Sequence, residues 1–254
     1  MSISISIHVD GYYGLTRGVE NLLRLFDKYG IKASFFINMG REANILELLK
    51  HRSKGLKKED KGIVKRYSKG QLMKMSLLSR KLGHGNCKII RKIISKGHEV
   101  NPHSWSHLKW SKNFQKMDSK KEIKKMKQSF IKCTGKSPKG FAPPTWKIND
   151  FLLEELKKQG FEYVGVNKGK KQTKKGILII PLSFSKNIEE LLNEGKRREE
   201  IISIYKKELK KKYVNLYFHA DFEGLRGIRI FEEVLKLIDP KKVITYNEIL
   251  KKSK

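Results

Sequence analysis

The stretch SISISIHVDGYYG (residues 2–14) alternates polar and apolar residues as far as Val9 and then ends on Asp10 and a glycine-containing turn. Such alternation predicts a β-strand. Because residues two apart on a strand point to the same side, His8 and Asp10 are expected to project together from its carboxyl end. This strand therefore delivers two ionisable side chains to one cleft.

The rest of the chain alternates strand-like and helix-like stretches, with about eight predicted βα units. Such a pattern indicates an α/β fold, either a parallel barrel or a doubly wound sheet. At 254 residues, we expect one domain spanning 1–254. The predicted strands are 2–9, 32–38, 98–102, 140–143, 163–167, 177–182, 214–219 and 243–245.

Two helices can be delimited from their end signals. The stretch 16–30 has apolar residues at three- and four-residue spacing and closes on Gly30, which suits a left-handed helix end. The stretch 150–160 repeats this arrangement, with Asp150 as the expected N-cap and Gly160 as the stop.

A long insertion at about 52–82 interrupts the alternation and is rich in lysine and arginine with interleaved apolar residues. Two interpretations stay open. The segment is a solvated helical excursion, or it is a basic amphipathic element that rests on an anionic membrane surface.

The 57 Lys+Arg against 26 Asp+Glu give a net charge of +31. This excess favours an anionic partner, such as nucleic acid, anionic lipid headgroups or a phosphorylated substrate. A lysine-rich surface of the kind found in heat-adapted proteins explains the charge equally well. No recognition motif accompanies the lysines, so nucleic acid is the least favoured partner.

Cys87 and Cys133 lie in no CxxC or Cys/His cluster, and we assign them no role. A reducing cytoplasm is therefore the expected location. The sequence shows neither an apolar run of membrane-spanning length nor a signal peptide, so any membrane contact is expected to be peripheral, at the inner face of the membrane.

His103 and His107 stand four residues apart just after a predicted strand. Histidines fall at this spacing by chance as well, but imidazoles so placed can hold one metal ion. Asp10 would complete a two-His, one-carboxylate set that leaves metal positions open for water and substrate. His219 ends another predicted strand. This grouping at strand ends is typical of metal-assisted hydrolysis in a (β/α) barrel.

Six motifs in this sequence resemble, in order and spacing, those of the NodB-type polysaccharide deacetylases. Within that family the likeness is greatest to the deformylases that act on formamido-arabinose linked to phosphoundecaprenol. It covers nearly the whole chain and includes a counterpart of the basic insertion. The motifs are HVDGYYGLTRG (8–18), GIKASFFINMGR (30–41), GHGNCKIIRKIISKGHEVNPHSWSHLKW (83–110), FAPPTWK (141–147), YVGVNKG (163–169) and FHADFEG (218–224).

The resemblance implies a distorted, TIM-like (β/α) barrel with one divalent metal ion held by Asp10, His103 and His107. Zinc is the first choice, and manganese, cobalt, iron or nickel suit the same ligands. It also implies hydrolysis of an N-formyl or N-acetyl amide on an amino sugar, with a polyprenyl-phosphate carrier as one option. His219 takes the position of the acid that protonates the leaving amine.

His8 departs from the family pattern, which has an aspartate there as the general base. A neutral imidazole can accept a proton from water, and a nearby dication favours that neutral form. The longer ring can also reach the metal as a fourth ligand and close the site. A third reading is an inactive homologue that binds a glycan or a lipid-linked sugar.

Six further residues are expected to contact the substrate. Lys147 stands where the nearest relatives carry arginine, so it can meet a phosphate without a bidentate fork. Asn167 follows Val166, which occupies a position where an acidic residue is expected. The substrate-binding candidates are Trp146, Lys147, Pro143, Asn167, Glu223 and His84.

Overall fold

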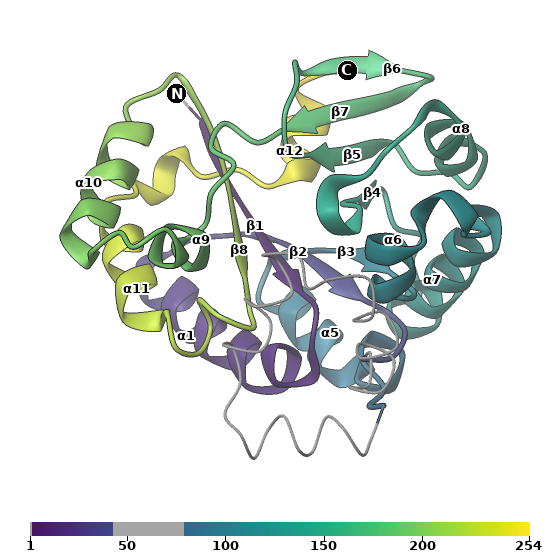
Figure 1. The fold of residues 1–254 in the computed structure, drawn as a ribbon, viewed down its shortest axis with the longest axis horizontal. Helices are drawn as coiled ribbons and strands as arrows, with labels where there is room; N and C mark the ends of the chain where they lie inside the picture. Colours follow the sequence, from purple (N-terminus) through teal and green to yellow (C-terminus); the bar gives the residue numbers. More distant parts are fainter. Residues whose placement is uncertain (1, 43–78) are drawn as a thin grey trace.

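Strands and helices alternate along the chain in the computed structural model, which describes residues 2–42 and 79–254 (Figure 1). The α/β fold class expected from the sequence is confirmed. The strands are β1 (Ser2–Val9), β2 (Ser34–Asn38), β3 (Glu99–Ser104), β4 (Gly140–Phe141), β5 (Tyr163–Val166), β6 (Gln172–Lys174), β7 (Ile177–Pro181) and β8 (Tyr213–His219). The helices are α1 (Val19–Tyr29), α5 (Cys87–Ser95), α6 (His107–Lys112), α7 (Ser119–Thr134), α8 (Asp150–Lys158), α9 (Ile188–Asn193), α10 (Arg198–Glu208), α11 (Ile228–Lys236) and α12 (Tyr246–Lys251).

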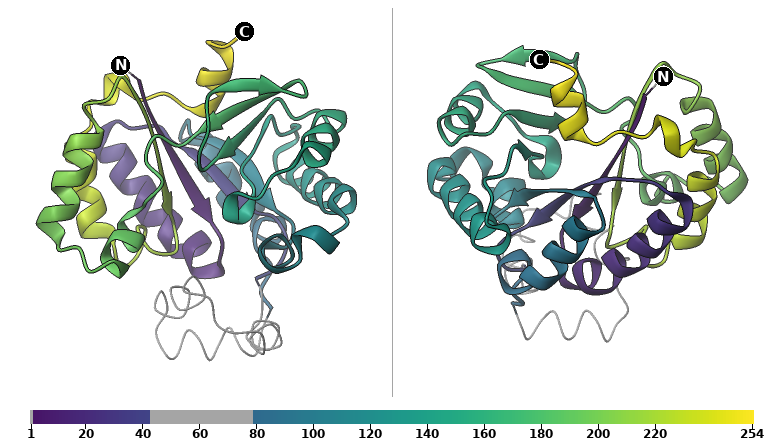
Figure 2. Two further views of the ribbon diagram at one scale, coloured as in Figure 1. Left: turned by 45° about the horizontal axis from the view of Figure 1, so that its top comes forward. Right: turned by 180° about the vertical axis from the view of Figure 1, so that it is seen from behind.

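The two faces of β1 explain its alternating sequence. Ile3, Ile5 and Ile7 are fully buried in the core between the strands and the surrounding helices. Burial of each such side chain stabilises the fold by about 1.5–3 kcal/mol. The alternate residues, of which Ser6 and His8 are examples, face the opposite side of the strand. Helices α1, α7 and α10 lie outside the strands in both views of Figure 2.

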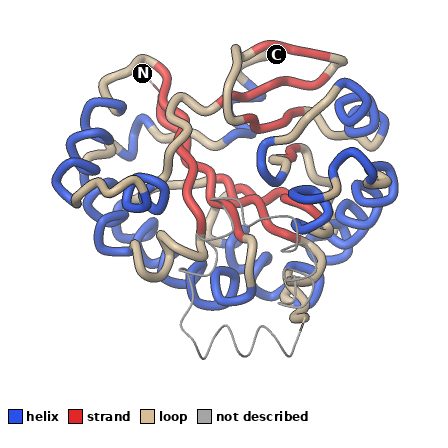
Figure 3. The backbone as a smooth tube through the Cα atoms, in the orientation of Figure 1, coloured by secondary structure: helices blue, strands red, loops and turns tan. Residues whose placement is uncertain are grey.

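The strands form two four-stranded sheets, with the orders β3-β2-β1-β8 and β4-β5-β7-β6. All pairings are parallel except that of β6 with β7. The strands of both sheets are red in Figure 3. At one junction, Asn101 Oδ1 accepts the N–H of Gly140, at 2.9 Å. At the other, the N–H of Ser183 donates to the carbonyl of Asn215, at 3.0 Å. The two sheets thus approximate the ring of a distorted barrel, with isolated hydrogen bonds in place of a ladder at the two junctions.

A buried carboxylate ties four elements together inside the ring. Glu99 on β3 accepts hydrogen bonds from Ser34 Oγ at 2.7 Å, from the Asn247 N–H at 3.0 Å and from the Tyr163 hydroxyl. Burial raises the pKa of Glu99 above its ordinary value. Because α12 packs into the same interior through Tyr246 and Leu250, this end of the ring is filled. The functional side chains must therefore gather at the other end.

Most of the predicted elements are present with ends shifted by one or two residues, and three features differ more clearly. Helix α1 ends at Gly30 in the left-handed conformation (φ 64°), as predicted. Helix α8 begins at Asp150, but its N-cap is Asn149, whose Oδ1 accepts the N–H of Leu152. The predicted strand 243–245 is a single bridge from Val243 to Ile3, because the chain turns at once into α12. The short strand β6 was not predicted, since all three of its residues are exposed.

Cys87 on α5 and Cys133 on α7 form a disulfide, which corrects the expectation that neither cysteine has a role. The two helices pack side by side, so residues 46 positions apart in sequence come within a Cα–Cα distance of 4.9 Å. That proximity depends on tertiary packing and has no local signal.

The basic insertion predicted at about 52–82 lies outside the described residues from 52 to 78. Within the described ranges, no helix combines the length and the apolar character that a membrane crossing requires.

Candidate metal centre and active site

Four polar side chains converge where strands β1, β3 and β8 end. Asp10 directly follows β1, His103 lies near the end of β3 and His107 opens α6. His219 ends β8 and is the direct ladder partner of His8 on β1. Because carboxyl ends of parallel strands share one edge, residues from distant parts of the chain meet there.

Asp10, His103 and His107 form a group that suits a metal ion. Their nearest ligand atoms all lie within 4.8 Å of one another, and this is the group that emerges from the described residues. His103 Nε2 is 3.4 Å from Asp10 Oδ1, and His107 Nε2 is 3.8 Å from the same oxygen. Two imidazoles and one carboxylate are a ligand set that zinc and other divalent metals accept.

The protonation of His103 fits a ligand role. Its Nδ1 lies 2.6 Å from the carbonyl oxygen of Ala142 and therefore donates a proton to it. The lone pair then resides on Nε2, the atom that faces Asp10. Burial lowers the pKa of His103 to about 4, so the ring is neutral near pH 7. The residues present thus fit a divalent ion, both in donor chemistry and in orientation.

Asp221 supports the turn that carries Asp10, a role that the sequence did not indicate. Its carboxylate accepts the backbone N–H of Asp10 at 3.0 Å and that of Gly11 at 3.3 Å. A side chain at Gly14 would meet the same carboxylate, since an added Cβ would lie 2.4 Å from its carbon. The glycine at position 14 therefore allows Asp221 to reach the turn.

His8 is 3% exposed and lies among aromatic rings next to the candidate metal-binding group of Asp10, His103 and His107. Its ring centroid is 4.6 Å from that of His103 and 4.9 Å from that of Trp146. Its Nε2 has no hydrogen-bond partner among the described residues. Burial, followed by the nearby His103 and His219, holds the pKa of His8 well below its ordinary value. The His8 ring stays outside the ligand group of Asp10, His103 and His107.

His219 faces Asp10 from the neighbouring strand β8, with Nε2 3.6 Å from Asp10 Oδ2. Its other ring nitrogen, Nδ1, lies 2.9 Å from Nδ2 of Asn187. Asn187 was missed from the sequence. The pattern Asn187-x-x-Glu190 before a helix signals an N-cap, but nothing local indicates a partner 32 residues away.

Trp146 and Asn167, two of the predicted substrate contacts, line one hollow of about 490 Å³. Trp146 also packs edge-on against Tyr217, with 5.2 Å between ring centroids. Both Thr145 and Trp146 have positive φ angles, 54° and 60°. Left-handed backbone is strained for side chains of this size, and such strain concentrates at functional sites. The turn therefore presents Trp146 beside His8.

Lys147 and His84 are both engaged with backbone carbonyls. The Nζ of Lys147 donates to Ser111 O at 2.7 Å, at the surface. His84 Nδ1 lies 2.8 Å from Met39 O, and its ring packs on Trp105. The structure thus gives His84 a contact that organises the loop after β2.

Glu223 and Pro143 are buried. The Glu223 carboxylate accepts the backbone N–H of His219 at 2.7 Å and that of Glu189 at 3.2 Å. Since it is fully enclosed, Glu223 braces the strand that carries His219 and is not exposed to a substrate. Pro143 is the N-cap residue of the turn η5 (Pro144–Trp146) that carries Trp146.

Comparison with known proteins identifies the family. The model of the polysaccharide deacetylase family matches residues 3–164. This chain belongs to that family. The resemblance seen in its sequence motifs is thereby confirmed. A Shewanella sediminis protein named as a 4-deoxy-4-formamido-L-arabinose-phosphoundecaprenol deformylase is 30% identical over 261 residues, covering 92% of this polysaccharide deacetylase and 80% of the relative.

Solved structures share the fold of this polysaccharide deacetylase at low sequence identity. A Mycobacterium smegmatis crystal structure assigned to the polysaccharide deacetylases has a TM-score of 0.68 at 15% identity, covering 98% of this chain and 88% of that one. A Bacillus anthracis pseudoenzyme of carbohydrate esterase family 4 has a TM-score of 0.54 at 12% identity, covering 98% and 65%. A mutant of that pseudoenzyme is described as having restored enzymatic activity.

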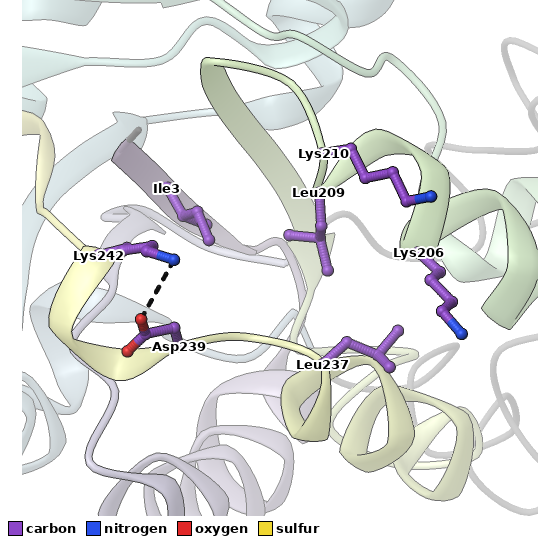
Figure 4. Close-up of a pocket in the computed structure, with 7 residues that line it drawn as sticks. All are labelled: Ile3, Lys206, Leu209, Lys210, Leu237, Asp239 and Lys242. Carbon is purple, nitrogen blue, oxygen red and sulfur yellow. Dashed lines mark ion pairs between the residues drawn. The ribbon is translucent and has the colours of Figure 1, made fainter.

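A second hollow, of about 470 Å³, lies at the other end of this polysaccharide deacetylase (Figure 4). Ile3 lines it at the start of β1, whereas Asp10 follows the end of the same strand. Its walls include Leu209 and Leu237, and at its rim Lys242 pairs with Asp239 at 3.3 Å. Like the hollow lined by Trp146 and Asn167, it contains none of the four side chains Asp10, His103, His107 and His219.

Proposed function

We propose that this polysaccharide deacetylase hydrolyses an N-formyl or N-acetyl amide on an amino sugar, with one divalent metal ion at Asp10, His103 and His107. The observation that carries the proposal is the convergence of these three ligand atoms, within 4.8 Å, beside the buried ring of His8. Zinc is the first choice, and manganese, cobalt, iron or nickel are alternatives. A bound ion of this kind polarises the amide carbonyl and acidifies a bound water.

His8 is proposed as the group that takes a proton from the attacking water. Three properties support this role: the ring is neutral, it lies outside the ligand group, and its Nε2 has no partner among the described residues. A base needs an available lone pair within reach of the water, and His8 is adjacent to His103. His219 presents its Nε2 to the same space from β8.

The proposed substrate is an amino sugar that Trp146 and Asn167 bind in the hollow they share. An aromatic ring and an amide are common partners of sugar faces and hydroxyls. The name of the Shewanella relative suggests a formamido-arabinose carried on a polyprenyl phosphate. Lys147 is exposed and is proposed to meet that phosphate. With a lipid carrier, the net charge of +31 suits peripheral contact with an anionic membrane surface.

The second candidate function is glycan or lipid-linked sugar binding without hydrolysis. It is favoured by the presence of His8 where the family resemblance gives an aspartate, and by the fold likeness to a pseudoenzyme. His8→Asp separates the two candidates. If the wild type is inert and His8→Asp turns over a formamido or acetamido sugar, the binding function is correct. If His8→Asp is slower than an active wild type, His8 is a working base.

The decisive experiment measures metal content and turnover together. The variants are His103→Ala and His8→Ala, with His84→Ala as a histidine outside the ligand group. The substrates are the undecaprenyl-phosphate-linked formamido-arabinose and a chito-oligosaccharide. We expect about one ion per chain in all but His103→Ala, and no turnover in His103→Ala or His8→Ala. Turnover by metal-free His103→Ala would refute the proposed metal site.

A further inference from the structure

The orientation of the Asn187 side chain is fixed by its own helix. Asn187 is fully buried and caps α9, where its Oδ1 accepts the backbone N–H of Glu190 at 2.9 Å. If the amide were turned over, its NH₂ group would face that N–H, and two donors would oppose each other. The oxygen therefore belongs on the Glu190 side. The NH₂ group is the one that faces His219, 2.9 Å from Nδ1.

This orientation determines where His219 carries its proton. An NH₂ group donates, so Nδ1 of His219 must accept, and the ring proton is on Nε2. We infer that Asn187 is a positioning residue that holds Nδ1 of His219 as a hydrogen-bond acceptor and so keeps an N–H on Nε2, directed into the proposed active site. What that proton does in the reaction rests on the proposed function, whereas the tautomer itself rests on the hydrogen bonds alone.

Two further contacts keep Asn187 and His219 in register. The buried carboxylate of Glu223 bridges the N–H groups of His219 and Glu189, joining the end of β8 to the first turn of α9. Two residues before His219 on β8, the Tyr217 hydroxyl donates to the carboxylate of Glu190. The strand end and the helix start are therefore held together on both sides of the amide–imidazole hydrogen bond.

The consequence concerns the proton that the departing amine requires. With Nδ1 engaged as an acceptor, His219 offers the N–H of Nε2 as a hydrogen-bond donor. A second proton on Nδ1 would point at the NH₂ group of Asn187. His219 is therefore a hydrogen-bond donor to the reacting amide. When water adds to the carbonyl carbon, one water proton passes to His8, and the same proton goes to the amine nitrogen as the C–N bond breaks.

The first test reads the tautomer directly. Asparagine, aspartate and serine are all good N-cap residues, so Asn187→Asp and Asn187→Ser preserve α9. Two-bond ¹H–¹⁵N correlation spectra of the zinc-loaded protein are recorded at neutral pH, with His219→Gln to assign the His219 signals. We expect an unprotonated Nδ1 and a protonated Nε2 in the wild type. Asn187→Asp should protonate Nδ1, and Asn187→Ser should give a mixture. A protonated Nδ1 in the wild type overturns the inference.

The second test separates hydrogen-bond donation from proton transfer. Glutamine at position 219 can donate a hydrogen bond but cannot act as an acid. His219→Ala and His219→Gln are compared on the 4-formamido sugar and on its 4-O-formyl ester, whose leaving alcohol needs less assistance from an acid. We expect His219→Ala to lose about 100-fold on both substrates and His219→Gln to recover part of both losses. If both variants lose activity equally on the amide and keep it on the ester, His219 is the acid that protonates the amine. That result would overturn its assignment as a hydrogen-bond donor.

The role of Asn187 and the proposed function can be refuted separately. If the protein turns over neither substrate, the hydrolase proposal fails, and the nitrogen signals of His219 still decide what Asn187 does. If turnover is present and the signals show a protonated Nδ1, the function stands and the role of Asn187 is refuted.

Discussion

The carboxylate of Asp221 accepts the backbone N–H of Asp10, so one acidic residue holds in place the residue proposed to bind the metal. The same carboxylate takes the N–H of Gly11. Because both bonds go to the main chain, Asp221 fixes the direction in which the Asp10 side chain leaves β1. The geometry of the metal-binding group thus depends on a residue 211 positions away in the sequence.

Asp221→Ala should weaken metal binding without removing a ligand. Loss of a group that orients a metal ligand commonly costs about 10–100-fold in metal affinity. Zinc affinity measured by competition with a chromogenic chelator gives the value. Asp239→Ala is the control, because Asp239 is an exposed aspartate that caps a turn far from Asp10 and pairs with Lys242. An unchanged affinity in Asp221→Ala would show that the Asp10 turn holds its shape unaided.

The sequence predicted that Asp10, His103 and His107 meet because strand ends are a strong constraint. Alternation along β1 placed His8 and Asp10 on one side, and the parallel order brought His103 and His219 to the same edge. The supporting residues escaped prediction for a different reason. Asn187 and Asp221 act through contacts between elements remote in sequence, and such pairings depend on packing that no local pattern encodes.

His98 should make stability depend on pH in the acid range. It packs between Phe26 and Phe35, and its Nδ1 accepts the N–H of Ala33 at 3.1 Å. Burial lowers the pKa of His98 to about 4. Between its ordinary value near 6.5 and about 4, the unfolded chain binds the proton and the folded chain does not, so stability falls as pH falls through this window. The loss approaches about 3 kcal/mol at the lower end.

Urea unfolding at several pH values, compared between wild type and His98→Leu, isolates this contribution from that of other titrating groups. The free energy of unfolding of the wild type should fall relative to that of His98→Leu as the pH is lowered from 7 to 4.5. A difference that is constant with pH would mean that His98 is protonated equally in both states.

The disulfide between Cys87 and Cys133 should account for a measurable share of stability. It closes a loop of 46 residues, for which the chain-entropy estimate is about 4 kcal/mol. Dithiothreitol should therefore lower the melting temperature of the wild type. The double variant Cys87→Ser, Cys133→Ser should melt at the reduced temperature and be insensitive to the reductant. Metal content should be equal in all three samples, because neither cysteine belongs to the metal-binding group. Equal melting of reduced and oxidised protein would contradict the prediction.

The strained turn at Thr145 should lower the stability of the protein and favour substrate binding. Thr145 is β-branched and has a φ of 54°, a conformation that glycine adopts freely. Thr145→Gly should raise the free energy of unfolding by up to about 1 kcal/mol, since relief of strain outweighs the added freedom of the unfolded chain. It should also raise KM for the amino sugar, because Trp146 is then held less rigidly beside His8.

Lys175→Gly is the control, as Lys175 has a similar φ of 52° in the turn between β6 and β7. That variant should leave KM unchanged. An equal change of KM in both variants would show that the Thr145 backbone has no part in presenting Trp146.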